Sequence, residues 1–216
     1  MSGLPVVVVG SGGHAKVVID ALLSAGRRVL FATDPDAGSH GRTILGVTVA
    51  GGDDALWRHE PSTVEVALGM AVPEGDVAQA SSRRLRIIRD ISGRGYRMAT
   101  VIHPSAIISK SAALGEGCQI MAGAIIQPDC RLGSYTILNT RASVDHDCRI
   151  GDNVHLAPGV VLGGGITISN DAHLGLGAVI APGVSIGAGS VIAAGAVVLR
   201  NVEQGQRVAG IPAKRF

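Results

Sequence analysis

The chain has 216 residues, which is enough for one large domain or two small ones. Apolar residues make up 46% of it but aromatic residues only 2%, so the core must be built from Val, Ile, Leu and Ala. The formal net charge of +2 gives no electrostatic reason to expect nucleic acid or an anionic membrane surface as a partner.

The N-terminus and the cysteines indicate a cellular compartment. Residues 1–3 lead directly into an apolar segment, without the basic flank and long apolar core of a signal peptide. Cys118, Cys130 and Cys148 show no CxxC spacing, so neither a zinc site nor a disulfide framework is expected. We therefore expect a cytoplasmic protein without a metal site and without a membrane-inserted segment.

The first elements form a strand–turn–helix–strand pattern. A buried strand is expected at 5–9, a glycine turn at 10–14, a helix at 15–25 and a second strand at 28–32. This order is typical of a Rossmann-like unit, in which a helix N-terminus faces a phosphate.

The glycine turn and the acids after the second strand are candidate nucleotide-binding residues. Gly10, Gly12 and Gly13 would let the backbone approach a phosphate, and Asp34 or Asp36 is placed to bind a ribose hydroxyl. The turn lacks a full GxGxxG, so an ordinary tight turn between strand and helix is an equally good interpretation of this segment alone.

The rest of the N-terminal part completes a small α/β unit. Another strand is expected at 64–68 and a helix at 76–93, with Arg83, Arg84, Arg86 and Arg89 on a solvated face. Residues 97–102 lead into a different pattern, so we place a Rossmann-like domain at 1–100 and a second domain, with a C-terminal cap, at 101–216.

The second domain has a six-residue repeat without an insertion. Aliphatic side chains occupy every sixth position from Ile102 to Val198, and a column of mostly small residues follows four positions later. The aliphatic positions are Ile102, Ile108, Leu114, Ile120, Ile126, Leu132, Leu138, Val144, Ile150, Leu156, Leu162, Ile168, Leu174, Ile180, Ile186, Ile192 and Val198.

A triangular coil of parallel strands explains this period, which fits neither a helix nor a lone strand. Three six-residue units make one coil, so residues 18 apart stack at about 4.8 Å. Glycines that follow the aliphatic position, such as Gly115, Gly133 and Gly151, are expected to relieve turns with positive φ. The long apolar stretch 172–199 is interpreted as repeat core, and the cysteines as compact core residues.

With both patterns taken together, the chain resembles the bacterial nucleotide-sugar N-acetyltransferases of bacillosamine and perosamine biosynthesis, and the related sialic acid O-acetyltransferases. The resemblance covers essentially the whole chain. It rests on the opening VVVVGSGGHAKVVID, the uninterrupted hexapeptides, the segment ILNTRASVDHDCRIGDNVHLAPG and the ending VAGIPAKRF.

The resemblance implies a left-handed β-helix, a homotrimer, and acetyl-CoA in a groove between neighbouring helices. It implies that the N-terminal domain holds a nucleotide-linked amino sugar. The family's catalytic histidine falls on His146 and the following acid on Asp147, with Asp145 as an alternative acid. Its supporting polar residues, expected to contact substrate, fall on Asn139 and His155. The cofactor-binding positions that it implies are His155, Gly164, Leu176, Ala194 and Lys214.

These residue types fit acetyl transfer to an amine. A base must take the amine proton while the nitrogen attacks the thioester, and a histidine oriented by a carboxylate suits this role near neutral pH. The coil predicts that Gly164 lies one coil above His146, where backbone left bare by glycines lets acetyl-CoA approach closely.

The role of some of these residues stays open. His155 either assists, binds substrate or does neither, and His173 is expected to be an ordinary exposed histidine. Lys214 either meets a CoA phosphate or is a surface lysine.

Three functions compete for the whole chain. The first is an N-acetyltransferase that uses acetyl-CoA and a UDP- or GDP-linked 4-amino sugar, and the second is a sialic acid-type O-acetyltransferase. The third is a non-catalytic trimeric scaffold. The polar cluster around His146 argues against the scaffold, which would need no such residues in a turn.

Overall fold

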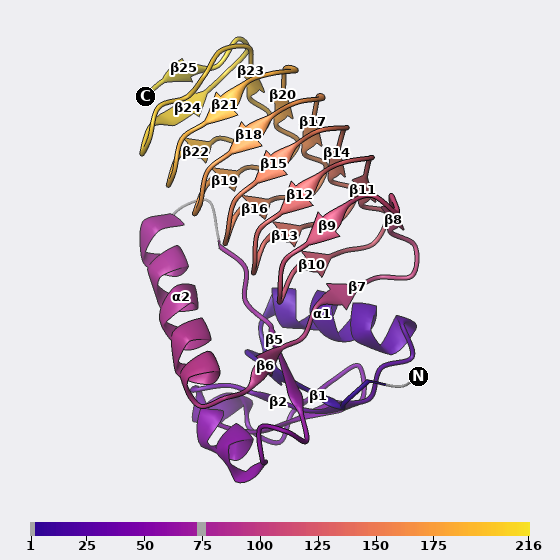
Figure 1. The fold of residues 1–216 in the computed structure, drawn as a ribbon. Helices are drawn as coiled ribbons and strands as arrows, with labels where there is room; N and C mark the ends of the chain where they lie inside the picture. The colour runs from indigo at the N-terminus through magenta and orange to yellow at the C-terminus, as the bar shows by residue number, and fades with distance from the viewer. Residues whose placement is uncertain (1–2, 73–76) are drawn as a thin grey trace. The chain divides into compact units, whose positions relative to one another are not determined.

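A computed structural model describes residues 3–72 and 77–216. The chain forms two compact units, one of residues 1–71 and 83–104 and the other of residues 72–82 and 105–216. The first unit is α/β and the second is a parallel β-helix, as the sequence predicts (Figure 1).

The α/β unit is built on a mixed six-stranded sheet of order β3-β4-β2-β1-β5-β6. Only β3 and β4 pair antiparallel; the other neighbours are parallel. The strands are β1 (Val6–Val9), β2 (Val29–Thr33), β3 (Thr43–Ile44), β4 (Val47–Gly51), β5 (Glu65–Leu68) and β6 (Arg97–Met98), and β7 (Val101–Ile102) follows. The sequence predicted β1, β2 and β5 but not the β3–β4 pair.

Helices complete this unit. α1 (Gly13–Ser24) follows the glycine turn, and short 3-10 helices occupy Ala37–Ser39 and Asp53–Arg58. α2 (Val77–Gly93) matches the helix predicted at 76–93, whose first residue lies outside the described part. The predicted solvated face is wrong at Arg84, whose side chain is only 1% exposed. Its position in α2 turns it inward, whereas Arg83, Arg86 and Arg89 are exposed.

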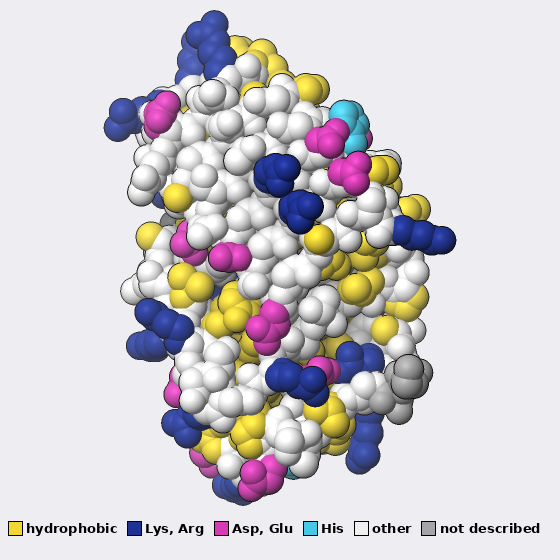
Figure 2. Space-filling view, in the orientation of Figure 1, with side chains coloured by type: hydrophobic (Ala, Val, Ile, Leu, Met, Phe, Trp, Pro, Cys, Tyr) yellow, Lys and Arg dark blue, Asp and Glu magenta, His cyan; other side chains and the backbone are white. Residues whose placement is uncertain are grey.

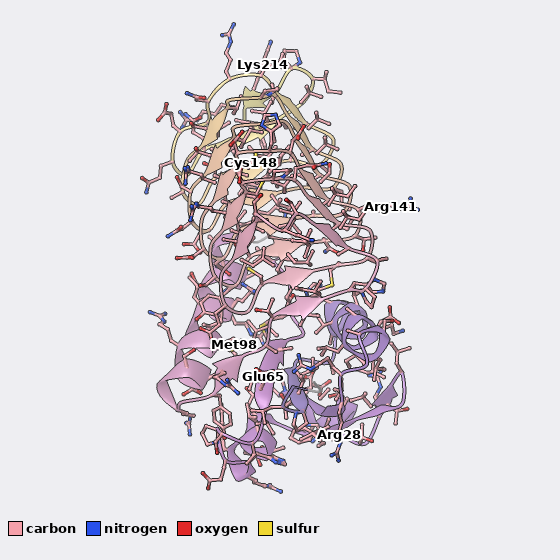
Figure 3. The ribbon with its side chains drawn as sticks, turned by 45° about the vertical axis from the view of Figure 1, so that its right-hand side comes forward. Arg28, Glu65, Met98, Arg141, Cys148 and Lys214 are labelled. Atoms are coloured by element: carbon pink, nitrogen blue, oxygen red, sulfur yellow. The ribbon has the colours of Figure 1, made fainter. Side chains whose placement is uncertain are left out.

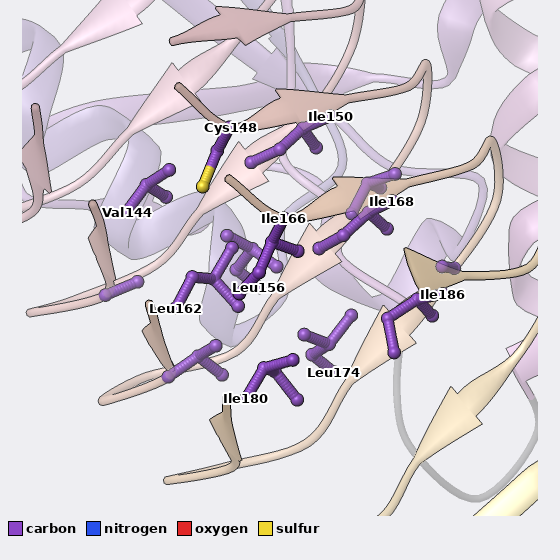
Figure 4. Close-up of a cluster of buried hydrophobic side chains, with 14 of the residues drawn as sticks. Val144, Cys148, Ile150, Leu156, Leu162, Ile166, Ile168, Leu174, Ile180 and Ile186 are labelled. Atoms are coloured by element: carbon purple, nitrogen blue, oxygen red, sulfur yellow. The ribbon is translucent and has the colours of Figure 1, made fainter. Parts of the chain in front are cut away.

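In the second unit, two-residue strands stack on three faces, 18 residues apart. His155 pairs with His173, Val161 with Val179 and Arg149 with Thr167. The sequence-predicted coil of three hexapeptides is thereby confirmed. Because the strands alternate inward and outward side chains, the aliphatic column fills the axis, as the close-up in Figure 4 shows for Val144, Leu162 and Ile180.

The three faces differ in what they expose. The covered face carries β10 (Gln119–Ile120), β13 (Ile137–Leu138), β16 (His155–Leu156), β19 (His173–Leu174), β22 (Val191–Ile192), β24 (Arg207–Ala209) and β25 (Lys214–Arg215). The apolar face carries β8 (Ile107–Ile108), β11 (Ile125–Ile126), β14 (Ser143–Val144), β17 (Val161–Leu162), β20 (Val179–Ile180) and β23 (Val197–Val198). The polar face carries β9 (Ala113–Leu114), β12 (Arg131–Leu132), β15 (Arg149–Ile150), β18 (Thr167–Ile168) and β21 (Ser185–Ile186).

The covered face is closed by the unit's own N-terminal segment. Val72 and Val77 pack on Val191, and Ser81 accepts a hydrogen bond from Asn153 at 2.8 Å. His173 is only 2% exposed on this face, so its expected exposure is wrong. A segment that comes before the repeats in the sequence makes this face interior.

Two glycine columns serve the turns in different ways. Positive φ recurs every six residues at a column that includes Gly117, Asp147, Asn153 and Gly165. The glycines predicted for this role, Gly115, Gly133 and Gly151 among them, do not have positive φ. A Cβ on Gly151 would lie 2.3 Å from Asn170 Oδ1 of the next coil, so these glycines instead allow neighbouring coils to stack closely. That part of the sequence interpretation is wrong.

Residues 172–199 form strands and turns of the β-helix. Among the described residues, no helix is long and apolar enough to cross a bilayer.

Candidate active site

Functional side chains gather at three places. One is the glycine turn of the α/β unit. The other two are turns of the β-helix: the His146 corner (residues 145–148 and 163–166) joins the apolar and polar faces, and the Leu176 corner (residues 139–142, 157–160, 175–178 and 193–196) joins the covered and apolar faces.

The glycine turn leaves the N-terminus of α1 open. Gly10 has φ of 111°, and a Cβ there would come within 3.1 Å of Gly69 O, so the end of β1 requires a glycine. A Cβ added to Gly12 or Gly13 would meet no other atom within 4 Å. No side chain caps α1 at Gly12, and the glycines leave space around its first turn, as an anion site requires.

Asp34 is held beside this turn. Its carboxylate accepts hydrogen bonds from the backbone N–H of Ser11 at 3.1 Å and from the Ser11 hydroxyl, and from Asp36 N–H at 2.9 Å. Burial raises the pKa of Asp34, but these hydrogen bonds outweigh burial, so the pKa lies below its usual value. Asp36 accepts from Gly38 N–H at 3.0 Å and caps the 3-10 helix that follows. The sequence interpretation did not identify Ser11, which orients Asp34.

At the His146 corner, a carboxylate fixes the imidazole. His146 Nδ1 lies 2.8 Å from Asp147 Oδ2. Because a carboxylate accepts, Nδ1 carries the proton and Nε2 keeps its lone pair. Asp145 accepts instead from the His146 backbone N–H at 2.8 Å. Of the two acids that the sequence left open, Asp147 is the one that contacts the ring.

Electrostatics strengthen His146 as a base. The hydrogen bond to Asp147 raises the pKa of His146, and the charges of Asp145 and Asp147 raise it further. The side chain is 62% exposed, so a substrate can reach it. Asp147 has φ of 60°, a conformation that non-glycine residues rarely adopt, and this turn points its side chain back to the preceding ring.

Gly164 lies directly against the ring, as the predicted coil requires. A Cβ at Gly164 would lie 2.6 Å from both Nε2 and Cε1 of His146. Within the described part of the chain, no acceptor is found for the Gly164 N–H, while the next N–H, of Gly165, donates to His146 O at 2.8 Å. Bare backbone and the free edge of the imidazole therefore share one small space.

His155 occupies a different environment from His146. It is 5% exposed, and its Nδ1 donates to Val72 O at 2.9 Å, so its Nε2 is the acceptor and lies 3.5 Å from Asn139 Nδ2. The His173 ring contacts it edge-on with centroids 5.0 Å apart. Asn139 Oδ1 accepts from Thr140 N–H at 2.8 Å. The sequence could not identify Val72, because it acts through its carbonyl group.

The remaining predicted cofactor residues lie apart from His146 within this chain. Leu176 is 55% exposed, and Ala194 lies one coil further along the same Leu176 corner, where Gly195 N–H donates to Leu176 O at 2.7 Å. Lys214 is exposed in β25, at the C-terminal end of the β-helix (Figure 3). The apolar face separates the Leu176 corner from the His146 corner.

The cysteines are unsuited to covalent chemistry. All three are fully buried, and Cys148 lies inside the coil (Figure 3). Burial raises the pKa of Cys148 to about 11 and also raises that of Cys130. Among the described residues, no group of three or more His, Cys, Asp or Glu side chains could hold a metal ion.

Family models match both units. Residues 5–73 match the PglD N-terminal domain, residues 129–164 the bacterial transferase hexapeptide (six repeats), and residues 165–200 the hexapeptide repeat of succinyl-transferase. The fold and these matches define the class as a hexapeptide-repeat transferase with a PglD-type N-terminal domain.

Similar proteins of known structure identify the family more narrowly. The chain is similar to perosamine N-acetyltransferase from Caulobacter crescentus, whose structure was solved as a histidine-to-asparagine mutant in complex with CoA and GDP-perosamine. The two share 38% sequence identity and a TM-score of 0.89, and the match covers 98% of this chain and 96% of that one. The chain is also similar to the acetyltransferase domain of PglB from Neisseria gonorrhoeae in complex with acetyl coenzyme A, at 30% identity and a TM-score of 0.91, with 99% and 100% covered.

A curated relative agrees with these structures. UDP-N-acetylbacillosamine N-acetyltransferase from Bacillus subtilis is 36% identical over 126 residues, which cover 54% of this chain and 51% of that protein, so the match spans about half of its length. The chain belongs to the PglD-type hexapeptide-repeat nucleotide-sugar N-acetyltransferase family.

Proposed function

We propose that this protein transfers the acetyl group of acetyl-CoA to the amino group of a UDP- or GDP-linked 4-amino sugar. The observation that carries the proposal is the His146 corner, where an imidazole oriented by Asp147 lies against the bare backbone of Gly164. The relatives support the substrate class, since their names include GDP-perosamine, CoA and acetyl coenzyme A.

His146 acts as the general base in this proposal. The neutral amine attacks the thioester carbon, and its proton passes to Nε2, the nitrogen that Asp147 leaves unprotonated. Asp147 then stabilises the imidazolium, which agrees with the raised pKa of His146. The buried His155 is a poor base, since its Nε2 lies beside the amide donor of Asn139.

The Gly164 backbone is suited to stabilise the oxyanion. A tetrahedral intermediate needs a hydrogen-bond donor beside the base, and Gly164 N–H is free for this within the described chain. When the intermediate collapses, the bond from carbon to sulfur breaks, and the thiolate of CoA takes the proton held by His146. The products are the acetamido sugar and free CoA.

We propose that the glycine turn binds the nucleotide. The open N-terminus of α1 would hold phosphate oxygens, and Asp34, kept ionised by Ser11, would accept a ribose hydroxyl. Asp36 retains acceptor capacity beside it.

The apolar face supports a homotrimer. Its outward side chains include Ile107, Val161 and Val179, which are 64%, 44% and 39% exposed. Such an apolar stripe is typical of an interface between copies. The His146 and Leu176 corners flank this face on its two sides. A threefold arrangement would therefore bring the His146 corner of one copy beside the Leu176 corner of the next and form the groove for acetyl-CoA, with Lys214 near its end.

Thiol release tests the proposed reaction. The protein is incubated with acetyl-CoA and a panel of UDP- and GDP-linked amino and hydroxy sugars, and CoA is detected with a thiol reagent. Because all three cysteines are buried, the folded protein should add little background. An amino sugar should release CoA, whereas release only with hydroxy sugars would favour the O-acetyltransferase alternative, and no release with any acceptor would exclude the enzyme.

His146→Ala tests the base. We expect turnover to fall by about 10² to 10⁴, the range that general base catalysis contributes, without loss of the folded trimer. Near wild-type activity would remove His146 from this role. Arg89→Ala, at an exposed residue of α2 outside all three candidate places, is the matched control and should leave the reaction unchanged.

A further inference from the structure

The polar face carries a groove that the proposed reaction does not use. Its volume is about 630 Å³, and it crosses strands β12, β15 and β18. Arg131 and Arg149 lie on neighbouring strands of this groove, paired in register. Figure 2 shows Lys or Arg side chains side by side on this part of the β-helix, among mostly uncharged atoms.

The two arginines form an uncompensated positive pair. Directly paired residues on neighbouring strands lie about 5 Å apart at the backbone, and like charges at such positions are destabilising. No ion pair or side-chain hydrogen bond involves either guanidinium in the described structure, and the residues that line the groove include no Asp or Glu. The nearby carboxylate of Asp147 is engaged with His146.

Further donors line the same groove. Thr167 continues the arginine column on the next strand, and Ser169 follows on the same coil. Asn170 uses its oxygen to accept from Asp152 N–H at 2.9 Å, which leaves its amide N–H₂ as a donor. Two guanidinium groups, two hydroxyls and an amide fit an anion with several oxygens, because arginine binds phosphate oxygens through two parallel hydrogen bonds.

Two strands of the groove follow the His146 corner along the chain, although the lining residues include none of that corner. Arg149 opens strand β15, which leaves the His146 corner after residue 148, and Thr167 opens β18 after the Gly164 turn of the same corner.

We propose that Arg131 and Arg149 bind the diphosphate group of one of the enzyme's two substrates. This inference rests on the proposed function for its substrates. Both substrates carry a diphosphate, one in the nucleotide sugar and one in CoA. The arginine pair binds one of them and positions the reacting end of that molecule at the His146 corner.

Isothermal titration of the wild type and of the double variant Arg131→Gln/Arg149→Gln with CoA, UDP and GDP tests the proposal. Removing both charge-assisted contacts should weaken one ligand class at least tenfold and leave the other unchanged. A loss for CoA assigns the diphosphate to the cofactor. A loss for UDP or GDP assigns it to the nucleotide sugar, and the glycine turn then does not hold the phosphates of that substrate. Equal affinities in the two proteins, or an equal loss for every ligand, would overturn the proposal.

Inorganic pyrophosphate separates this site from the proposed reaction. The wild-type chain should bind it with one more site than the double variant, and Arg86→Gln, at an exposed arginine of α2, should bind it as the wild type does. If acetyl transfer fails but this difference is found, the proposed function is wrong and the arginine site stands. If acetyl transfer is found and pyrophosphate binding is the same in all three proteins, the arginine site is wrong.

Discussion

The ring of His146 contacts a carboxylate on one side and a glycine on the other, and each contact controls a different property of the base. Asp147 fixes the tautomer and raises the pKa. In the proposed reaction, Gly164 leaves space for the thioester carbon beside Nε2. A substitution at Asp147 should therefore change pH dependence, while a substitution at Gly164 should change the rate at every pH.

Asp147→Asn should move the acid limb of the pH profile. His146 accepts a proton only when neutral, so kcat/KM falls as the pH drops below its raised pKa. Removing the Asp147 charge and its charge-assisted hydrogen bond lowers that pKa, so the acid limb moves to lower pH. Well above both pKa values, the remaining difference in rate reports lost orientation of the ring.

The measurement is kcat/KM from about pH 5 to pH 9, the range in which histidines titrate. Asp145→Asn is the matched comparison, since Asp145 bonds the backbone and acts on the ring only through its charge. It should shift the limb less than Asp147→Asn. An acid limb at the same pH in the Asp147 variant would contradict the assignment of Asp147.

Gly164→Ala should lower kcat without unfolding the protein. The added Cβ would lie 2.6 Å from the imidazole, whose exposed side chain can turn away. Displacing a catalytic group by about 1 Å costs roughly a hundredfold in rate. Steady-state kinetics and a thermal melt measure the two effects. Gly93→Ala, where a Cβ meets nothing within 4 Å, should leave kcat unchanged, and wild-type kcat in the Gly164 variant would refute the close contact.

At the scale of elements, the six-residue turn uses two columns of residues for two purposes. Positive φ is accepted by glycines and also by Asp147, Asn153 and Asp171, so that column tolerates side chains. In the column two residues earlier, glycines such as Gly133 and Gly151 leave no space for a side chain, because a Cβ there would strike the next coil. Close stacking, rather than φ, is therefore what demands glycine at positions such as Gly133 and Gly151.

Gly151→Ala should destabilise the β-helix. The new Cβ would lie 2.3 Å from Asn170 Oδ1 and 2.8 Å from Asn170 N, and backbone cannot move aside as a side chain does. Overpacking of this kind costs about 1–3 kcal/mol of the free energy of unfolding. A denaturant titration measures the change, with Gly12→Ala, where space is open, as the control. Unchanged stability would show that the coils can separate without cost.

The repeat was predictable because each hexapeptide carries its own signal. The aliphatic column and the coil length followed from the spacing, and so did the closeness of Gly164 to His146. His173 was mispredicted because its face of the β-helix is covered by residues such as Val72 and Val77, which lie far from it in the sequence. Arg84 was mispredicted because a run of arginines does not reveal which of them turns inward.

For the whole molecule, the sequence patterns indicated two units with different tasks. The family matches follow the same division, with one model on residues 5–73 and two on residues 129–200. The Ser11 contact to Asp34 and the Val72 carbonyl on His155 were not predictable, since both depend on folded geometry. The homotrimer was expected only from the resemblance, because an outward column of valines cannot be told from a core column by sequence alone.

Val161→Glu tests that assembly at the level of the whole molecule. Val161 points outward from the apolar face and is 44% exposed, so a monomer should tolerate the charge. In a trimer packed through this face, three carboxylates would be buried close together without partners, which costs several kcal/mol. We expect the variant to have the mass of one chain by light scattering, whereas the wild type has the mass of three.

Activity should fall together with the trimer, because the Leu176 corner that completes the groove comes from the next copy in the proposed arrangement. Ser185→Glu, exposed on the polar face and outside the arginine groove, should keep both the trimer and the rate. A Val161→Glu variant that stays trimeric would place the interface elsewhere. A monomeric variant with full acetyl transfer would show that one chain holds the complete site, and the Leu176 corner would then have no part in it.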